Sequence, residues 1–257
     1  MTNLLEAVGV SVTFKSYGFE VKAVQNVNFA LPQGKVVGIV GESGSGKSTL
    51  ARVLSGLQIP TAGQVNYLGK NIQEGNETYR GELRKAVQMV FQDPYSSLNP
   101  RMRIINAVSE AVRQHQNSNH DEAYEIALAL LKRMGISEID SRKYPFSLSG
   151  GQRQRASVAR ALSAQPKILI ADEPTSAIDQ SAQAQLLELF GELIADGLSI
   201  VLVSHDLGVI RYLTDYVYVM ESGVFVESGS TSNIFDDPQE PYTQKLISSI
   251  PGHKTRK

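Results

Sequence analysis

The chain has 257 residues, 42% of them hydrophobic and 20% charged, which predicts one sizeable domain or a domain with an inserted subdomain. Its 25 basic and 26 acidic side chains give a formal net charge of -1, so charge does not indicate binding to nucleic acid or to an anionic membrane surface. The absence of cysteine excludes disulfides, thiolate zinc sites, cysteine-ligated iron–sulfur clusters and a catalytic thiol. The start lacks a basic segment followed by an apolar one, and no apolar run approaches about 18 residues, so we expect neither a signal peptide nor a membrane span.

Strand patterns open the chain. Residues 4–14 and 21–31 are rich in valine, phenylalanine and leucine and flank a short turn, which predicts an antiparallel hairpin. The β-branched run at residues 36–40 predicts the next strand. Further strands are expected at residues 64–67 and 86–91, separated by a polar stretch.

A turn cluster at residues 93–100 marks a change from strand-rich to helix-rich sequence. Apolar side chains at helical spacing within residues 123–134 predict an amphipathic helix. Asn119 and Glu122 form a capping pair before it, and Gly135 is its stop signal. We therefore place a subdomain boundary at the turn cluster.

The second half of the chain alternates strands and helices. Strand patterns at residues 167–171 and 199–203 flank a helical pattern at 182–195, which predicts a parallel sheet covered on both faces. Strands at residues 217–220 and 224–227 form a final hairpin, and a short helical tail follows.

The segment Gly41-Glu42-Ser43-Gly44-Ser45-Gly46-Lys47-Ser48-Thr49 fits the phosphate-binding pattern G-x-x-x-x-G-K-[ST] between a predicted strand and a predicted helix. Its glycines let backbone N–H groups wrap a triphosphate, with the helix N-terminus beneath. Lys47 is expected to reach the β- and γ-phosphates, and the Ser48 hydroxyl to ligate Mg²⁺. The alternative, a glycine turn before an ordinary helix, is weak in this context.

Two carboxylates, Asp172 and Glu173, end an apolar strand. Ligands bind at that end of strands in open parallel sheets. Asp172 suits Mg²⁺ coordination through water, and Glu173 suits polarising a water for attack on the γ-phosphate. Without the phosphate loop, a solvated acidic turn would be the better interpretation.

Residues 148–152 open another helix with small side chains. The Ser149 hydroxyl and the N–H groups of Gly150, Gly151 and Gln152 predict a second anion site, although the isolated pattern also fits a capped helix. Two anion sites on separate elements predict a dimer with nucleotide between its subunits.

Two further polar residues, His205 and Gln92, follow predicted strands. His205 follows the strand at 199–203, where its imidazole can contact the γ-phosphate, although a lone histidine is more often structural. Gln92 follows the strand at 86–91, where its amide can contact Mg²⁺ or the attacking water. Alone, that glutamine would indicate nothing.

In chain order these residues resemble the nucleotide-binding subunit of an ATP-binding cassette (ABC) transporter, over nearly the whole chain. By this resemblance, residues 41–49 are the Walker A loop, Gln92 is the Q-loop glutamine and residues 148–152 are the signature. Asp172 and Glu173 are the Walker B aspartate and glutamate, residues 176–179 ending in Asp179 are the D-loop, and His205 is the switch histidine. The D-loop has Ile178 where the family more often has leucine.

This resemblance implies an α/β fold: a P-loop NTPase core with an N-terminal antiparallel β part and an inserted α-helical subdomain. We expect the core at residues 1–92 and 159–230, the helical signature subdomain at 93–158 and a tail at 231–257. An aromatic residue near the end of the first strand stacks on adenine in this family. Phe14 is the first candidate here, and Tyr17 is the alternative.

Residues 91–100 and 237–243 resemble the ATPase subunits of oligopeptide, dipeptide and nickel importers, without the C-terminal cysteine cluster of several of those subunits. This resemblance implies MgATP-driven import of peptides or of nickel and other metal complexes, at the cytoplasmic face of the plasma (inner) membrane. The implied partners are two transmembrane permease subunits, a second ATPase subunit that is most often a different chain and otherwise a second copy, and indirectly an extracytoplasmic solute-binding protein.

Two other classes of protein compete with this importer subunit. A soluble cassette ATPase working on DNA or ribosomes usually has a long coiled-coil insertion, a second cassette or zinc cysteines, and none is visible, so we expect no nucleic acid partner. A nucleotide-binding regulator without turnover predicts the loss of Glu173 or His205, and both are present.

Overall fold

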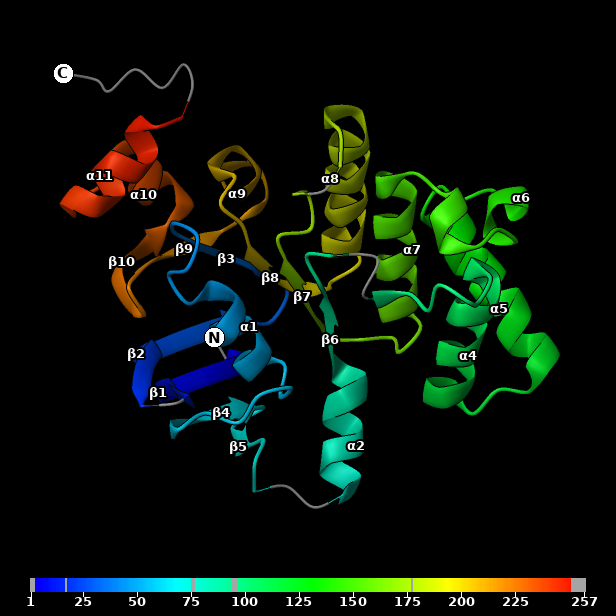
Figure 1. Cartoon of the computed structure of the whole chain (residues 1–257), viewed down its shortest axis with the longest axis horizontal. Coiled ribbons are helices and arrows are strands. Elements are labelled where there is room, and N and C mark those ends of the chain that lie inside the picture. The colour runs from blue at the N-terminus through cyan, green and yellow to red at the C-terminus, as the bar shows by residue number, and fades with distance from the viewer. Residues whose placement is uncertain (1–2, 17, 75–76, 94–96, 177, 251–257) are drawn as a thin grey trace. The chain divides into compact units, whose positions relative to one another are not determined.

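The computed structural model describes residues 3–16, 18–74, 77–93, 97–176 and 178–250 (Figure 1). The chain forms two compact units. The first unit comprises Met1–Leu83 with Gly197–Lys257, and the second comprises Arg84–Asp196. The division falls inside helix α2 (Glu77–Ala86). These boundaries differ from the predicted subdomain at 93–158, because the second unit also holds a strand pair and a further helix.

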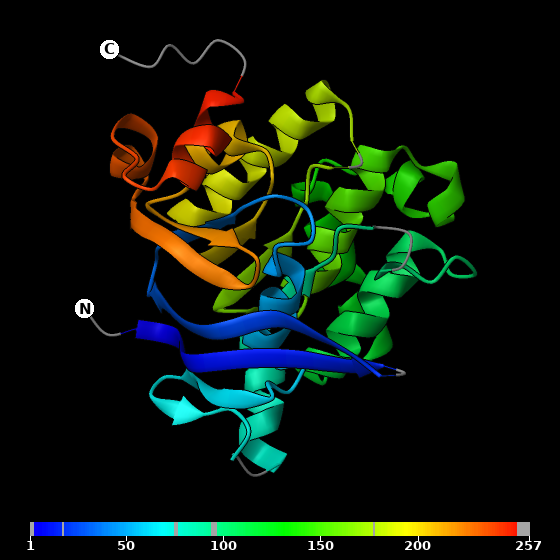
Figure 2. The same cartoon turned by 60° about the vertical axis from the view of Figure 1, so that its left-hand side comes forward.

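An antiparallel sheet begins the first unit. Strands β1 (Asn3–Ser16) and β2 (Phe19–Pro32) form the predicted hairpin and run side by side along their length (Figure 2). Strand β4 (Ala62–Tyr67) pairs with the other edge of β1, and the short β5 (Lys70–Asn71) pairs with β4. Alternate apolar side chains along these strands are buried, which explains the hairpin; they include Val10 and Val12 of β1 and Val27 and Phe29 of β2.

A second strand group of the first unit has the order β10-β9-β3-β8. Strand β3 (Val36–Val40) lies parallel to both β8 (Ser199–Val203) and β9 (Tyr216–Glu221), and β10 (Val224–Ser230) returns antiparallel to β9. Every residue of β3 and β8 is buried, as expected for strands covered on both faces. The helices of this unit other than α2 are α1 (Lys47–Leu54), α9 (Leu207–Leu213), α10 (Thr231–Asp236) and α11 (Pro241–Ser248).

The second unit contains a parallel strand pair and a group of helices. Strands β6 (Val87–Val90) and β7 (Ile168–Asp172) pair in the register Val90↔Ala171. The helix-rich sequence after the turn cluster forms helices as predicted, and Asn119 and Glu122 make the expected capping box. These helices are α4 (Ile104–Gln116), α5 (His120–Arg133), α6 (Glu138–Ser141), a 3₁₀ turn at Pro145–Ser147, α7 (Gly150–Leu162) and α8 (Gln180–Ala195).

The predicted fold class is confirmed, but helices α2 and α9 were not among the predicted elements. Helix α2 lies in the stretch interpreted from sequence only as polar. Its few apolar residues, Tyr79, Leu83 and Ala86, recur at helical spacing, but they stand in a mostly polar stretch and this spacing was overlooked. Among the residues that the structure describes, no helix is long and apolar enough to cross a membrane.

Candidate nucleotide-binding and catalytic site

The phosphate loop connects β3 to α1 in the first unit, and its glycines have backbone dihedrals that other residues rarely adopt. Gly41, Gly44 and Gly46 have φ angles of 153°, 83° and 106°. A Cβ atom on Gly41 would lie 2.1 Å from the Met220 carbonyl oxygen, and one on Gly46 would lie 2.1 Å from the Ala23 carbonyl oxygen. Neighbouring strands therefore exclude side chains at both ends of the loop.

Lys47 is held inside this loop although it carries a charge. Its side chain is only 4% exposed. Its Nζ atom donates to the carbonyl oxygens of Gly41 and Glu42, both at 2.8 Å, and to Ser45 Oγ at 3.4 Å. A fixed ammonium group beside backbone N–H groups and a helix N-terminus makes a site that favours a polyanion. This arrangement supports the predicted phosphate contact.

We expect Gly46→Ala to lower the free energy of unfolding by about 1–3 kcal/mol, because it adds both a strained φ and a contact with Ala23. Urea unfolding measures this change. The matched control is Gly191→Ala in α8, where the added Cβ meets nothing within 4 Å and helix propensity improves by up to about 1 kcal/mol. Equal stability of the Gly46 variant and wild type would contradict the packing argument.

His205 follows strand β8 at the same end of the sheet at which the phosphate loop follows β3. Ile39 of β3 pairs with Val203 of β8, so Gly41 and His205 each follow a paired residue by two positions. His205 is exposed. Asp206 caps α9 by accepting the N–H groups of Gly208 and Val209, which turns the chain directly after the histidine. The predicted γ-phosphate contact of His205 stays a prediction.

The end of the β1–β2 hairpin carries exposed apolar side chains. Phe14 is 46% exposed and pairs across the hairpin with Val21, which is 59% exposed, while Phe19 is 78% exposed. Farther along β2, Ala23 approaches Gly46 of the phosphate loop. Exposed apolar surface suits stacking with a base, so Phe14 stays the predicted adenine contact. Tyr17 lies outside the described residues. The exposed side chains of Phe19 and Val21 were not predicted, because all four residues at this end of β2 are exposed and no alternating pattern distinguishes them.

Glu173 and Gln92 contact each other in the second unit. Val90 of β6 pairs with Ala171 of β7, and each polar residue follows its strand two positions later. Gln92 Nε2 donates to Glu173 Oε2 at 2.9 Å. The preceding Asp172 is 4% exposed at the end of a fully buried strand. The structure therefore joins two residues whose roles were predicted separately.

The backbone of Glu173 has a left-handed φ of 46°. Such a conformation is uncommon for residues other than glycine and costs about 1–3 kcal/mol when the surrounding structure imposes it. Ser176 helps to hold it, since its N–H and Oγ donate to the Glu173 carbonyl oxygen at 3.2 and 3.0 Å. Backbone strain at a residue with a carboxylate side chain, next to a buried aspartate, is the pattern expected of a functional site.

Ser149 begins helix α7 and forms a complete capping box with Gln152. Its Oγ accepts the Gln152 N–H at 3.2 Å, and Gln152 Oε1 accepts the Ser149 N–H at 3.0 Å. Gln152 Nε2 also donates to Asp140 Oδ2 at 3.2 Å. The capped-helix interpretation thus describes these contacts, while the exposed Ser149 hydroxyl retains its own proton for donation. The anion site at Ser149–Gln152 stays a prediction.

The first turns of α7 and α8 are in close contact. A Cβ atom on Gly151 would lie 2.5 Å from Ala182 Cβ, so glycine is needed at this position. Asp179 caps α8, with Oδ1 accepting the Ala182 N–H at 2.9 Å. The predicted signature therefore packs against the first turn of the helix that Asp179 caps, and a nucleotide contact by Asp179 stays a prediction.

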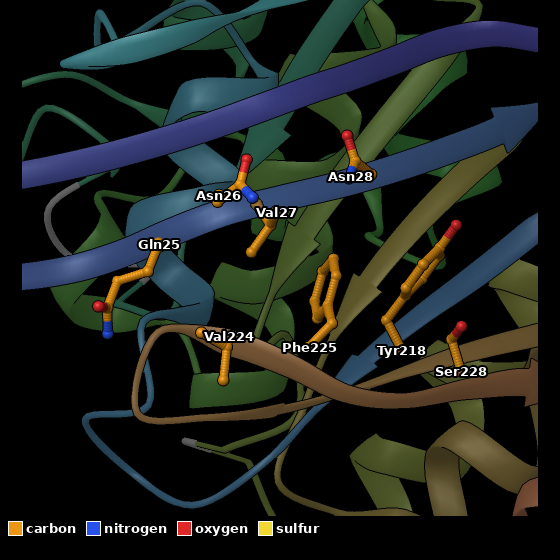
Figure 3. A pocket seen from close by; sticks show the side chains of 8 residues that line it. All are labelled: Gln25, Asn26, Val27, Asn28, Tyr218, Val224, Phe225 and Ser228. Carbon is orange, nitrogen blue, oxygen red and sulfur yellow. The ribbon is translucent and has the colours of Figure 1, made fainter.

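A separate groove of about 440 Å³ lies between β2 and β10 of the first unit (Figure 3). Its polar groups are bound to the protein: Asn28 Oδ1 accepts the Gly9 N–H, and Gln25 Nε2 donates to the Ser222 carbonyl oxygen. The Tyr218 hydroxyl likewise accepts the Ala30 N–H. None of the residues predicted to bind nucleotide lines this groove, so it is separate from the candidate site.

Comparisons with known proteins agree with this geometry. A family model described as ABC transporter matches residues 24–176, and one described as Oligopeptide/dipeptide transporter, C-terminal region matches residues 226–257. The chain is 42% identical to the Oligopeptide transport ATP-binding protein OppF of Lactococcus lactis subsp. lactis (strain IL1403), over 90% of this chain and 73% of that protein. It is 41% identical to the Dipeptide transport ATP-binding protein DppF of Escherichia coli (strain K12), over 90% and 70%.

Solved structures show the same fold. The dimeric structure of a post-hydrolysis state of the ATP-binding cassette MJ0796 bound to ADP and Pi has a TM-score of 0.81, with 29% identity over 88% of this chain and 98% of that chain. The structure of cbiO1 from Clostridium perfringens, part of the ABC transporter complex cbiONQ, has a TM-score of 0.79, with 27% identity over 98% and 97%.

Proposed function

Because the chain belongs to the ABC transporter family, we propose that it is the ATP-hydrolysing subunit of an importer for oligopeptides or dipeptides. The observation that carries the assignment of ATP hydrolysis is the hydrogen bond between Gln92 and Glu173, which lies beside a buried aspartate at the ends of two parallel strands. The relatives named above are peptide transport ATP-binding proteins, which does not favour a cassette working on DNA or ribosomes. Import of nickel or another metal complex stays a prediction.

In the proposed reaction, the phosphate loop binds ATP and Glu173 promotes its hydrolysis. Lys47 and the N–H groups of the loop bind the β- and γ-phosphates of ATP. Glu173 accepts a proton from a water that attacks the γ-phosphorus, the bond to the β-phosphate oxygen breaks, and ADP and phosphate leave. Gln92 holds the Glu173 carboxylate through its amide nitrogen. His205 supports the γ-phosphate from the end of β8.

Mg²⁺ is the expected metal, because Ser48, Asp172 and Gln92 offer the hydroxyl, carboxylate and amide oxygens that this ion prefers. The hydrogen bond of Gln92 is compatible with this role, since its amide nitrogen donates to Glu173 and its amide oxygen is the atom that would ligate the metal. When bound, Mg²⁺ neutralises charge on the β- and γ-phosphates.

The proposed membrane partners are inferred from the family, and a second ATPase subunit is inferred from the predicted anion site at Ser149. Two permease subunits would form the membrane pathway, with a solute-binding protein delivering peptide, and this chain would sit peripherally at the cytoplasmic face of the membrane. If Ser149 to Gln152 binds the γ-phosphate held by another ATPase subunit, hydrolysis requires a head-to-tail pair. The isolated chain should then be a weak ATPase whose rate rises when its partner ATPase or the permeases are added.

Ser149→Arg tests the shared site in a mixed dimer. The arginine should impair hydrolysis at the site containing the partner's phosphate loop and spare the site containing this chain's Lys47. Each composite site is assayed separately. Inactivating the partner's phosphate loop leaves only the site containing this chain's Lys47, whereas Lys47→Ala in this chain leaves only the site containing the partner's phosphate loop. The control Ala129→Arg adds the same side chain at an exposed position of α5 and should spare both sites. Impairment only at this chain's own Lys47 site would contradict the model.

Purifying the transporter with its membrane subunits identifies the cargo. Peptide-stimulated ATP hydrolysis in that complex, with binding of the same peptide by the solute-binding protein, is the expected result. Stimulation by a nickel complex and not by peptides would overturn the cargo assignment and leave the ATPase assignment intact.

A further inference from the structure

The C-terminal helix α11 contacts the phosphate loop through a tyrosine. The Glu42 N–H donates to Tyr242 Oη at 2.9 Å, across 200 positions of the sequence. Lys245, one turn later on α11, places Nζ 3.7 Å from Glu42 Oε1. Both side chains of this ion pair are well exposed, so solvent screens it and the tyrosine bond is the stronger link.

Tyr242 and Lys47 hold the same peptide group from opposite ends. The carbonyl of the Gly41–Glu42 peptide accepts Lys47 Nζ at 2.8 Å, and the N–H of that peptide donates to Tyr242. Rotation of the peptide would break both bonds. Hydrogen bonds at the two ends of one peptide also polarise each other, so each strengthens the other.

Helix α11 is anchored independently of the loop. Glu227 of β10 accepts the N–H groups of Gln239 and Glu240 at 2.8 and 3.1 Å, directly before the helix begins. Burial acts to raise the pKa of Glu227, but these backbone donors together with the Thr243 side chain outweigh it and hold the pKa below its ordinary value. Thr243 and Ile247 of α11 are buried. The position of Tyr242 is thus set by β10 and the core before any ligand binds.

We propose that Tyr242 is a positioning residue of the nucleotide site, which fixes the Gly41–Glu42 peptide and so seats Lys47 for phosphate binding. This inference rests on the proposed binding of ATP by residues 41–49. An ordered loop loses less conformational entropy when the ligand binds, so the tyrosine bond raises nucleotide affinity. By reciprocity, bound nucleotide must stabilise the contact with α11.

Tyr242→Phe removes only the hydroxyl and tests this role in the full chain. Calorimetric titration with MgATP should show a Kd about three- to tenfold weaker than wild type, the range expected for one net hydrogen bond. Thermal unfolding without nucleotide checks that the variant is folded. The matched control, Tyr212→Phe, changes a tyrosine on α9 that is 69% exposed and should leave the Kd unchanged.

Hydrogen exchange in the wild-type chain provides an independent measurement. Adding MgATP should slow amide exchange in α11, and Tyr242→Phe should abolish that protection even at saturating nucleotide. A wild-type Kd for the Tyr242 variant, or no protection of α11 in the wild type, would overturn the inference. A wild-type chain that fails to bind MgATP at all would instead refute the proposed function, so the two failures are distinguishable.

Discussion

Replacing Glu173 with glutamine is expected to lower ATP turnover by about 10²-fold or more while ATP still binds. Glutamine keeps the size of the side chain and an oxygen that can accept the Gln92 amide, so the contact at 2.9 Å can persist. It removes the basic oxygen that we propose takes a proton from the attacking water. Phosphate release in the assembled transporter measures turnover, and titration with MgATP measures binding.

The control for this substitution is Glu188→Gln, which makes the same chemical change at an exposed position of α8 and should leave turnover unchanged. Parallel loss of ATP binding and turnover in the Glu173 variant would show that this residue is structural. In that case the strained backbone of Glu173, with a φ of 46°, would serve the folding of the turn around Ser176 and not catalysis.

Lys47→Ala is expected to remove most measurable nucleotide binding, in contrast to the Glu173 variant. The ammonium group is nearly inaccessible to water, and its charge is held by the carbonyls of Gly41 and Glu42. Its loss deletes the positive charge facing the phosphates and leaves both carbonyls without that donor. A charge-assisted hydrogen bond contributes about 1.5–3 kcal/mol, so the Kd for MgATP should rise by at least about tenfold.

Lys132→Ala is the matched control, because it removes an exposed lysine on α5. Its Kd should equal that of the wild type. Unchanged nucleotide affinity in the Lys47 variant would contradict the assignment of residues 41–49 as the phosphate site. The same titrations with ADP show whether the effect depends on the γ-phosphate.

The sequence alone was sufficient for features that depend on local spacing. The phosphate loop needs a strand, glycines and a helix within a few consecutive residues, and the structure contains that order from Val36 to Leu54. The apolar strands, the Asn119 capping box and the helix-rich insertion are local in the same way. Helix α2 was missed because its stretch was interpreted by its polar composition alone, although its few apolar residues recur at helical spacing.

Contacts between residues distant in the chain were decided only by the tertiary structure. Gln92 and Glu173 are 81 positions apart, and the parallel register of β6 and β7 brings them together. Gly46 must be glycine because the Ala23 carbonyl of another strand lies where its side chain would be. Tyr242 reaches the phosphate loop because Glu227 anchors the turn before α11. A sequence pattern specifies which residue types are available and how a segment folds locally, whereas strand register and packing determine which of them meet.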